Sequence, residues 1–238
     1  MGAKENDVSR LINALPNCVM NTKQWINFAI SETETALALL YTFMKFQMMR
    51  EQKSHVDVMN RNAEFWMLHN GAVQHTLFIY LGRLSDDTDG KSFADLNRHC
   101  FINLKDFSRA SFLSRNPKRL KLNPEFLEGK TEPSREDMKR LFAMVKPHNS
   151  LLRGVCKTIR SKVFAHAILT EEHQCANLFS QVSLDKIEEA LLAYWSISKH
   201  LWECFHNARS IHPAPLDYIE RDQIFERTQR ALYGPPYR

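Results

Sequence analysis

The sequence predicts an all-α protein, an antiparallel helical bundle of a single domain. Only 7 of its 238 residues are glycine and 9 are proline, which argues against a turn-rich β protein. Hydrophobic residues make up 44% and charged residues 25%, as in globular proteins that bury a core. Apolar residues recur at helical spacing over several long segments. We therefore expect one domain over residues 1–238, with its core at about 21–209.

The first long helix is expected at about residues 21–53, where apolar residues form two neighbouring stripes. The first stripe contains Ile26, Ile30, Leu37, Leu40 and Met44, and the second contains Ala36, Leu39, Phe43 and Phe46. So wide an apolar face indicates a central helix. A polar break at residues 54–60 precedes a second long helix at about 61–84. The short connection predicts that the two helices pack as an antiparallel hairpin.

The second long helix also carries two apolar stripes, Phe65, Leu68, Ala72 and Ile79 beside Trp66, Val73, Leu77, Tyr80 and Leu84. It is expected to stop at the turn-forming residues 85–90. A short helix should follow, with Ser92 as its N-cap. The helical pattern weakens over about residues 105–134, which contain Pro117, Pro124, Gly129 and Pro133. We interpret this stretch as an irregular insertion.

The next helix is expected to start at a capping box formed by Ser134 and Asp137. Pro147 should divide or kink this helical stretch, whose second part, about 148–168, has a stripe of Leu152, Val155, Ile159 and Val163. Ser183 is the predicted N-cap of the last strong helix, to about residue 207. A further helix is expected at about 217–232.

Bulk composition excludes some classes of function. The net charge of +5 permits a nucleic-acid partner without requiring one. There is no GxGxxG or GxxxxGK[ST] phosphate loop. The five cysteines form no CxxC, which favours a reducing compartment over a disulfide framework or zinc ribbon. The charged N-terminus does not resemble a signal peptide, and uncharged apolar stretches are too short to span a bilayer, so we expect a cytoplasmic protein.

The chemically informative segment is Ile159-Arg-Ser-Lys-Val-Phe-Ala-His166, in which five residues separate Arg160 from His166. It lies at the end of a helix that follows the hairpin of long helices. This pattern resembles the signature of the HEPN superfamily, an arginine, four to six residues, then a histidine. The Arg-x-Lys…Ala-His form resembles the abortive-infection, AbiU-like branch. The run Arg83-Leu-Ser-Asp86 matches the Arg-Leu-x-Asp often found in that branch, and the resemblance covers roughly residues 21–209 in helix order.

The resemblance implies metal-independent endoribonuclease activity through attack of a ribose 2′-hydroxyl, without metal or cofactor. Histidine suits general acid or base catalysis near neutral pH, and the planar guanidinium of arginine suits a phosphate. The implied roles are His166 as base or acid and Arg160 on the phosphate, with Ser161 and Lys162 assisting. Active members commonly have Asn, Asp or His where Ser161 stands. A phage-defence or toxin setting, with a possible antitoxin or regulatory protein, is also implied.

Helix geometry adds a condition to this hypothesis. Six positions along an α-helix rotate by about 240° net and rise by about 9 Å, so Arg160 and His166 do not share a face of a straight α-helix. The usual solution of the family is a homodimer that faces two motifs across a cleft. We therefore expect a homodimer.

Several assignments keep two interpretations. His166 completes an apolar stripe and is equally a candidate for a packed core histidine. Arg83 with Asp86 or Asp87 either orients the site or forms a helix-end ion pair. A basic run with Phe107 and Phe112 interleaved is either an RNA-backbone patch or a solvated face. The candidate RNA-binding residues are Lys157, Arg109, Arg115, Lys118 and Arg119, beside Lys105 and Lys121.

An alternative function comes from a different class. The chain would then be a catalytically inactive helical module that dimerises and binds RNA, a nucleotide or a protein partner. Ser161 after the motif arginine favours this alternative. A structural or regulatory partner without any ligand is a third possibility.

Overall fold

The computed structural model describes residues 20–86, 91–117, 130–165 and 172–233. All regular elements in these ranges are helical, which confirms the predicted all-α class. The α-helices are α2 (Thr22–Arg50), α3 (Lys53–Asn60), α4 (Ala63–Ser85), α5 (Phe93–Ile102), α6 (Arg109–Arg115), α8 (Arg135–Ala143), α9 (Glu172–Ser180), α10 (Leu184–Asn207) and α11 (Arg221–Tyr233). Short 3₁₀ turns occupy Leu104–Phe107 and Lys146–His148, and π-helical turns occupy η4 (Leu151–Cys156) and η5 (Ile159–Ala165).

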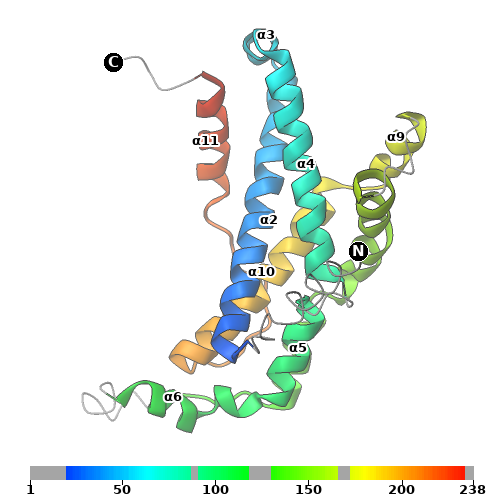
Figure 1. Cartoon of the computed structure of the whole chain (residues 1–238). Helices are drawn as coiled ribbons and strands as arrows, with labels where there is room; N and C mark the ends of the chain where they lie inside the picture. The colour runs from blue at the N-terminus through cyan, green and yellow to red at the C-terminus, as the bar shows by residue number, and fades with distance from the viewer. Residues whose placement is uncertain (1–19, 87–90, 118–129, 166–171, 234–238) are drawn as a thin grey trace, which may run out of the picture.

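Helix α2 is the centre of the bundle, as its wide apolar face predicts. A capping box between Asn21 and Gln24 starts the helix. Helices α4, α10 and α11 all pack against α2, so it buries side chains on several sides (Figure 1). Ile26, Leu37 and Leu40 are completely buried in the main core. The position of α2 thereby sets the positions of its three partners.

Helix α4 returns antiparallel to α2, and its two apolar stripes have different surroundings (Figure 1). Val73, Leu77 and Leu84, from the second stripe, are buried against the core. Phe65 and Leu68, from the first stripe, are 51% and 69% exposed. One face of α4 therefore holds the bundle together while an apolar row faces away from it.

Several helix starts lie where the sequence places them. Ser92 and Asp95 form a capping box at α5, and Ser134 and Asp137 form another at α8. At the start of α10, Ser183 accepts a hydrogen bond from the backbone of Lys186. Short polar side chains fix these boundaries locally, so they can be read from sequence.

Other boundaries correct the expectations. The expected polar break at residues 54–60 is part of helix α3, because α3 packs between α2, α4 and α11. Its His55 is buried and its ring lies 5.6 Å from that of Tyr233, so tertiary packing overrides a polar composition. Helix α9 was not expected at all, and α11 starts at Arg221 rather than at about residue 217. The segment expected as a regular α-helix before residue 168 contains π-helical turns.

The insertion is partly helical and is anchored to the bundle by α6. The guanidinium of Arg115 lies 3.9 Å from the ring centre of Phe205 in α10. It also donates hydrogen bonds to the backbone oxygens of Asp106 and Phe205. Phe107 and Phe112 are buried. Within the described ranges, no helix is both long enough and apolar enough to cross a membrane.

Substitution of Leu40 by alanine tests the central role of α2. Leu40→Ala is expected to lower the free energy of unfolding by about 2–5 kcal/mol, because the helices around it cannot fully close the cavity. Met48→Ala on the same helix, at a side chain that is 47% exposed, should change it by less than about 0.5 kcal/mol. Urea unfolding of both variants measures the difference. Equal losses would contradict the central position of α2.

Candidate functional site

The two motifs that the sequence analysis singled out separately lie together in the structure. Arg160 donates a hydrogen bond from Nη2 to Oδ2 of Asp86 over 2.8 Å. The carboxylate side chain is only 6% exposed and the arginine side chain 22%. Lys157, on the same face as Arg160, places Nζ 4.0 Å from Oδ1 of Asp86. A buried carboxylate therefore holds the motif arginine in a fixed orientation.

Gly82 makes this arrangement possible. A Cβ atom added at this position would lie 2.8 Å from Cζ of Arg160 and still closer to two other atoms of that side chain. The arginine thus lies directly against the backbone of α4, where only glycine leaves room. No such restriction exists at Gly71 in the same helix, where an added Cβ would meet nothing within 4 Å. Sequence analysis missed Gly82, although a glycine near the end of a long apolar helix is the available signal.

The end of α4 positions Asp86. The last helical residue is Ser85, whose hydroxyl donates to the backbone oxygen of Leu81 over 2.8 Å. Asp86 follows as the C-cap with an extended backbone, and its N–H donates to the oxygen of Gly82. Because the chain turns out of the helix here, the carboxylate points to Arg160. The short Gly82–Asp86 segment supplies both the room and the counter-charge for the arginine.

The segment of Arg160 is π-helical, which changes the expected geometry. Turns η5 span Ile159–Ala165, and hydrogen bonding from i to i+5 makes each turn wider than in an α-helix. The α-helical rotation per residue that the sequence analysis assumed therefore does not hold over Ile159–Ala165. Phe164 docks this segment on α4, with its ring 4.8 Å from that of His75 and 5.6 Å from that of Phe78. His166 itself lies outside the described residues.

Arg83 does not join this site through Asp86. Its Nη2 lies 3.2 Å from Oε1 of Glu32 in α2, and its guanidinium lies over the rings of Tyr80 and Phe28. Burial raises the pKa of Glu32, and the nearby arginine charge opposes this shift. Arg83 therefore fastens α4 to α2, and Glu32 was not foreseen as its partner. Asp87 lies outside the described residues.

The remaining candidates are spread over the molecule. Ser161 is half-buried and Lys162 is exposed, both beside Arg160 in η5. Arg109 is exposed on α6, far along the chain from the site, and its backbone N–H donates to Glu132. Burial lowers the pKa of Arg115, whose donors bond to backbone oxygens, and the aromatic rings of that region belong to the core. Lys118 and Arg119 lie outside the described residues.

The described part of the chain holds no group of three or more histidine, cysteine, aspartate or glutamate side chains that could bind a metal ion. The site around Arg160 offers a different chemistry. The guanidinium of Arg160 and the ammonium of Lys157 both lie beside the carboxylate of Asp86, and the exposed Lys162 follows in the same segment. Such a site favours a phosphate group over a cation.

Comparison with models of protein families gives a match. The model of a HEPN family described as AbiU2 matches residues 22–225, which include both segments of the site. No curated protein and no solved structure matches the chain.

Paired glycine substitutions test the packing of Arg160 on α4. Gly82→Ala is expected to be less stable than Gly71→Ala by about 1–3 kcal/mol, since both gain helix propensity but only the first forces Arg160 away. Chemical unfolding measures both. In an Arg160→Ala background the difference should disappear, because the obstructing side chain is gone. A difference that persists in that background would assign another role to Gly82.

Proposed function

This chain belongs to the AbiU2 abortive-infection branch of the HEPN superfamily, and on that premise we propose that it is a metal-independent endoribonuclease of phage defence. The observation that best supports the proposal is the ion pair of Arg160 with buried Asp86, over Gly82. We place the activity in the cytoplasm, with RNA as substrate. An antitoxin or regulatory protein that restrains it is part of this proposal.

Arg160 would bind the scissile phosphate. A guanidinium has five N–H donors, and among the described residues Arg160 gives one to Asp86. The remaining donors can face phosphate oxygens, where they stabilise the charge that develops in the transition state. Asp86 acts as a positioning residue because it restricts the rotation of the guanidinium. Lys157, which is 52% exposed, adds positive charge that attracts the RNA backbone.

His166 would move the protons, a role that comes from the family motif. As a general base it takes the proton of the ribose 2′-hydroxyl, whose oxygen then attacks the adjacent phosphorus. The bond to the 5′-oxygen breaks, and that oxygen is protonated as it leaves. The products are a 2′,3′-cyclic phosphate and a 5′-hydroxyl. Ser161 and Lys162 would assist by hydrogen bonding and by charge.

We propose a homodimer through the exposed apolar row of α4. Phe65, Leu68 and Ile79 are between 38% and 69% exposed on this helix. Ile79 lies three residues before Gly82 and next to the positions that contact Phe164. A two-fold contact near Ile79 would therefore face the Arg160 sites of both copies toward one cleft. Burial of these side chains supplies the driving force for association.

The second candidate function is a catalytically inactive module that binds RNA. Ser161 supports it, because this position is commonly Asn, Asp or His in active members, while the positive charge around Arg160 remains. Such a protein would bind RNA in a salt-sensitive manner without cutting it.

Cleavage of a mixed RNA pool in EDTA tests the nuclease. His166→Ala and Arg160→Ala are each expected to reduce the cleavage rate by at least about 100-fold, because each removes a group that acts in the transition state. His212→Ala, at an exposed histidine outside the site, should keep the wild-type rate. Gel analysis of end-labelled RNA gives the rates. Undiminished cutting by His166→Ala would refute the assignment, and RNA binding without cutting by wild type would support the inactive module.

A charge placed on the apolar row tests the dimer. Leu68→Glu is expected to convert a dimer into a monomer, because a carboxylate would have to be buried at the contact. Ile219→Glu is the matched control, since that isoleucine is 83% exposed but lies outside α4. Sedimentation velocity measures both. A monomeric wild type, or a Leu68→Glu protein that remains dimeric, would rule out this interface.

A further inference from the structure

A second arginine lies at the same end of α4 as Arg160, on a neighbouring side of the helix. Gly82, against which Arg160 packs, and Arg83 are consecutive residues, so their side-chain positions differ by about 100° around the helix axis. An α-helix with its side chains is about 10–12 Å in diameter, so we expect the two guanidiniums to lie within about one helix diameter of each other. The last turn of α4 thus has a guanidinium on each of two adjacent sides.

Each of these arginines is paired with a buried carboxylate. Nη2 of Arg83 lies 3.2 Å from Oε1 of Glu32, whose side chain is 10% exposed. Arg160 lies 2.8 Å from Asp86, whose side chain is 6% exposed. The arginine side chains themselves are 40% exposed at Arg83 and 22% exposed at Arg160. Because solvent meets the cations more than their counter-charges, this end of α4 presents positive charge outward.

Arg83 retains hydrogen-bond donors for a ligand. A guanidinium has five N–H donors, and within the described part of the chain Glu32 is its only acidic partner. Its Cζ lies 5.3 Å from the ring centre of Tyr80 and 6.0 Å from that of Phe28. These two rings and the carboxylate restrict the rotation of the side chain, so little freedom remains to be lost when a ligand binds. A guanidinium held in this way is suited to a phosphate group.

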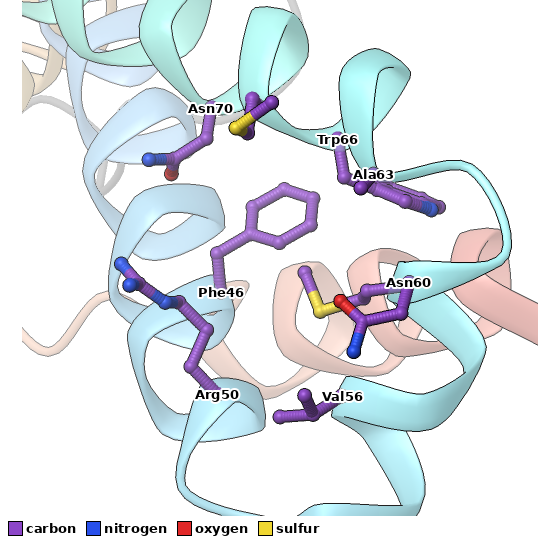
Figure 2. Close-up of a pocket in the computed structure, with 9 residues that line it drawn as sticks. Phe46, Arg50, Val56, Asn60, Ala63, Trp66 and Asn70 are labelled. Carbon is purple, nitrogen blue, oxygen red and sulfur yellow. The ribbon is translucent and has the colours of Figure 1, made fainter.

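Position distinguishes Arg83 from other exposed arginines. Arg221 has similar surroundings, since it is 45% exposed, lies 3.5 Å from Glu188 and lies over two aromatic rings. It belongs to α11, however, and α11 and α4 flank α2 in Figure 1. Arg50 lines a groove between the end of α2, α3 and the start of α4, at the opposite end of the bundle (Figure 2). Among these three exposed arginines, Arg83 is the one next to the packing site of Arg160.

We propose that Arg83 binds a second phosphate of the RNA whose scissile phosphate is bound by Arg160, an inference that rests on the proposed function. A stacked strand advances about 3.4 Å per phosphate, so a span of about 10–12 Å places the second phosphate about three nucleotides from the first. Glu32 acts as a positioning residue for Arg83. The substrate is therefore an oligonucleotide rather than a dinucleotide, and this contact adds affinity without selecting a base.

Binding of an uncleavable RNA at several salt concentrations is the first test. A 2′-O-methyl oligomer of about ten nucleotides cannot undergo 2′-hydroxyl attack, and fluorescence anisotropy measures its affinity. Arg83→Gln alone would leave the buried charge of Glu32 unpaired, so the test variant combines Arg83→Gln with Glu32→Gln. It should bind about tenfold more weakly than wild type. The slope of log affinity against log salt should become shallower by about 0.7, the value for one phosphate contact on a single strand.

Two controls separate phosphate binding from helix packing. Glu32→Gln alone retains the guanidinium of Arg83 and should keep the wild-type slope. Arg221→Gln combined with Glu188→Gln removes the similar pair at α11 and should also keep it. A folded double variant at Arg83 that keeps the wild-type slope would overturn the proposal, as would a wild type that binds no oligomer.

Substrate length distinguishes failure of this contact from failure of the nuclease. A dinucleoside monophosphate offers the scissile phosphate alone, so wild type should cleave the 2′-hydroxyl form of the oligomer with a higher kcat/KM. The double variant at Arg83 should lose this preference by about tenfold. Equal losses on both substrates, as from a merely structural defect, would overturn the contact and leave the nuclease. If wild type cuts neither substrate while the salt slope changes as expected, the nuclease fails and the contact stands.

Discussion

The burial of α2 on several sides is the constraint on which the rest of the architecture depends. Its apolar surface is too wide for one partner, so α4, α10 and α11 must all pack on it. Polar groups reinforce these contacts, with Tyr41 of α2 donating to Glu188 of α10 over 2.9 Å. Arg83 fastens the last turn of α4 to Glu32 of α2. The end of α4 is therefore rigidly placed, and the site is built on that end.

At the site, the buried Asp86 depends on Arg160, and Arg160 in turn depends on Gly82. A carboxylate as buried as Asp86 needs a cation, because an unpaired buried charge is strongly destabilising. Arg160 supplies it from another segment, yet its long side chain needs room against a helix backbone. Gly82 gives that room, at the expense of helix propensity in α4. The helix propensity lost at Gly82 is thus offset by the ion pair of Arg160 with Asp86. Such compensation is typical of functional sites.

How much of this structure can be predicted from the sequence depends on whether the residues that determine each feature lie close together in the chain. Capping residues such as Ser92 and Ser134 fix helix starts by bonds three residues away, so those starts were predicted correctly. Helix α3 was missed because it is stabilised by packing on α2, α4 and α11, contacts that local composition does not encode. The π-helical turns were missed because apolar spacing was read with the α-helical period. Arg160 and Asp86 were both selected as motif residues, but neither spacing nor charge pattern showed that they form a pair.

The pairing of Asp86 with Arg160 also has a consequence for folding during synthesis on the ribosome. The two residues are 74 positions apart, so the ribosome completes α2 and α4 well before it adds the arginine. Domains form from the N-terminal side during synthesis, and long-range contacts come late. A nascent or truncated chain that stops before position 160 lacks the side chain that is proposed to bind the phosphate. The proposed ribonuclease would therefore be inactive in its incomplete copies.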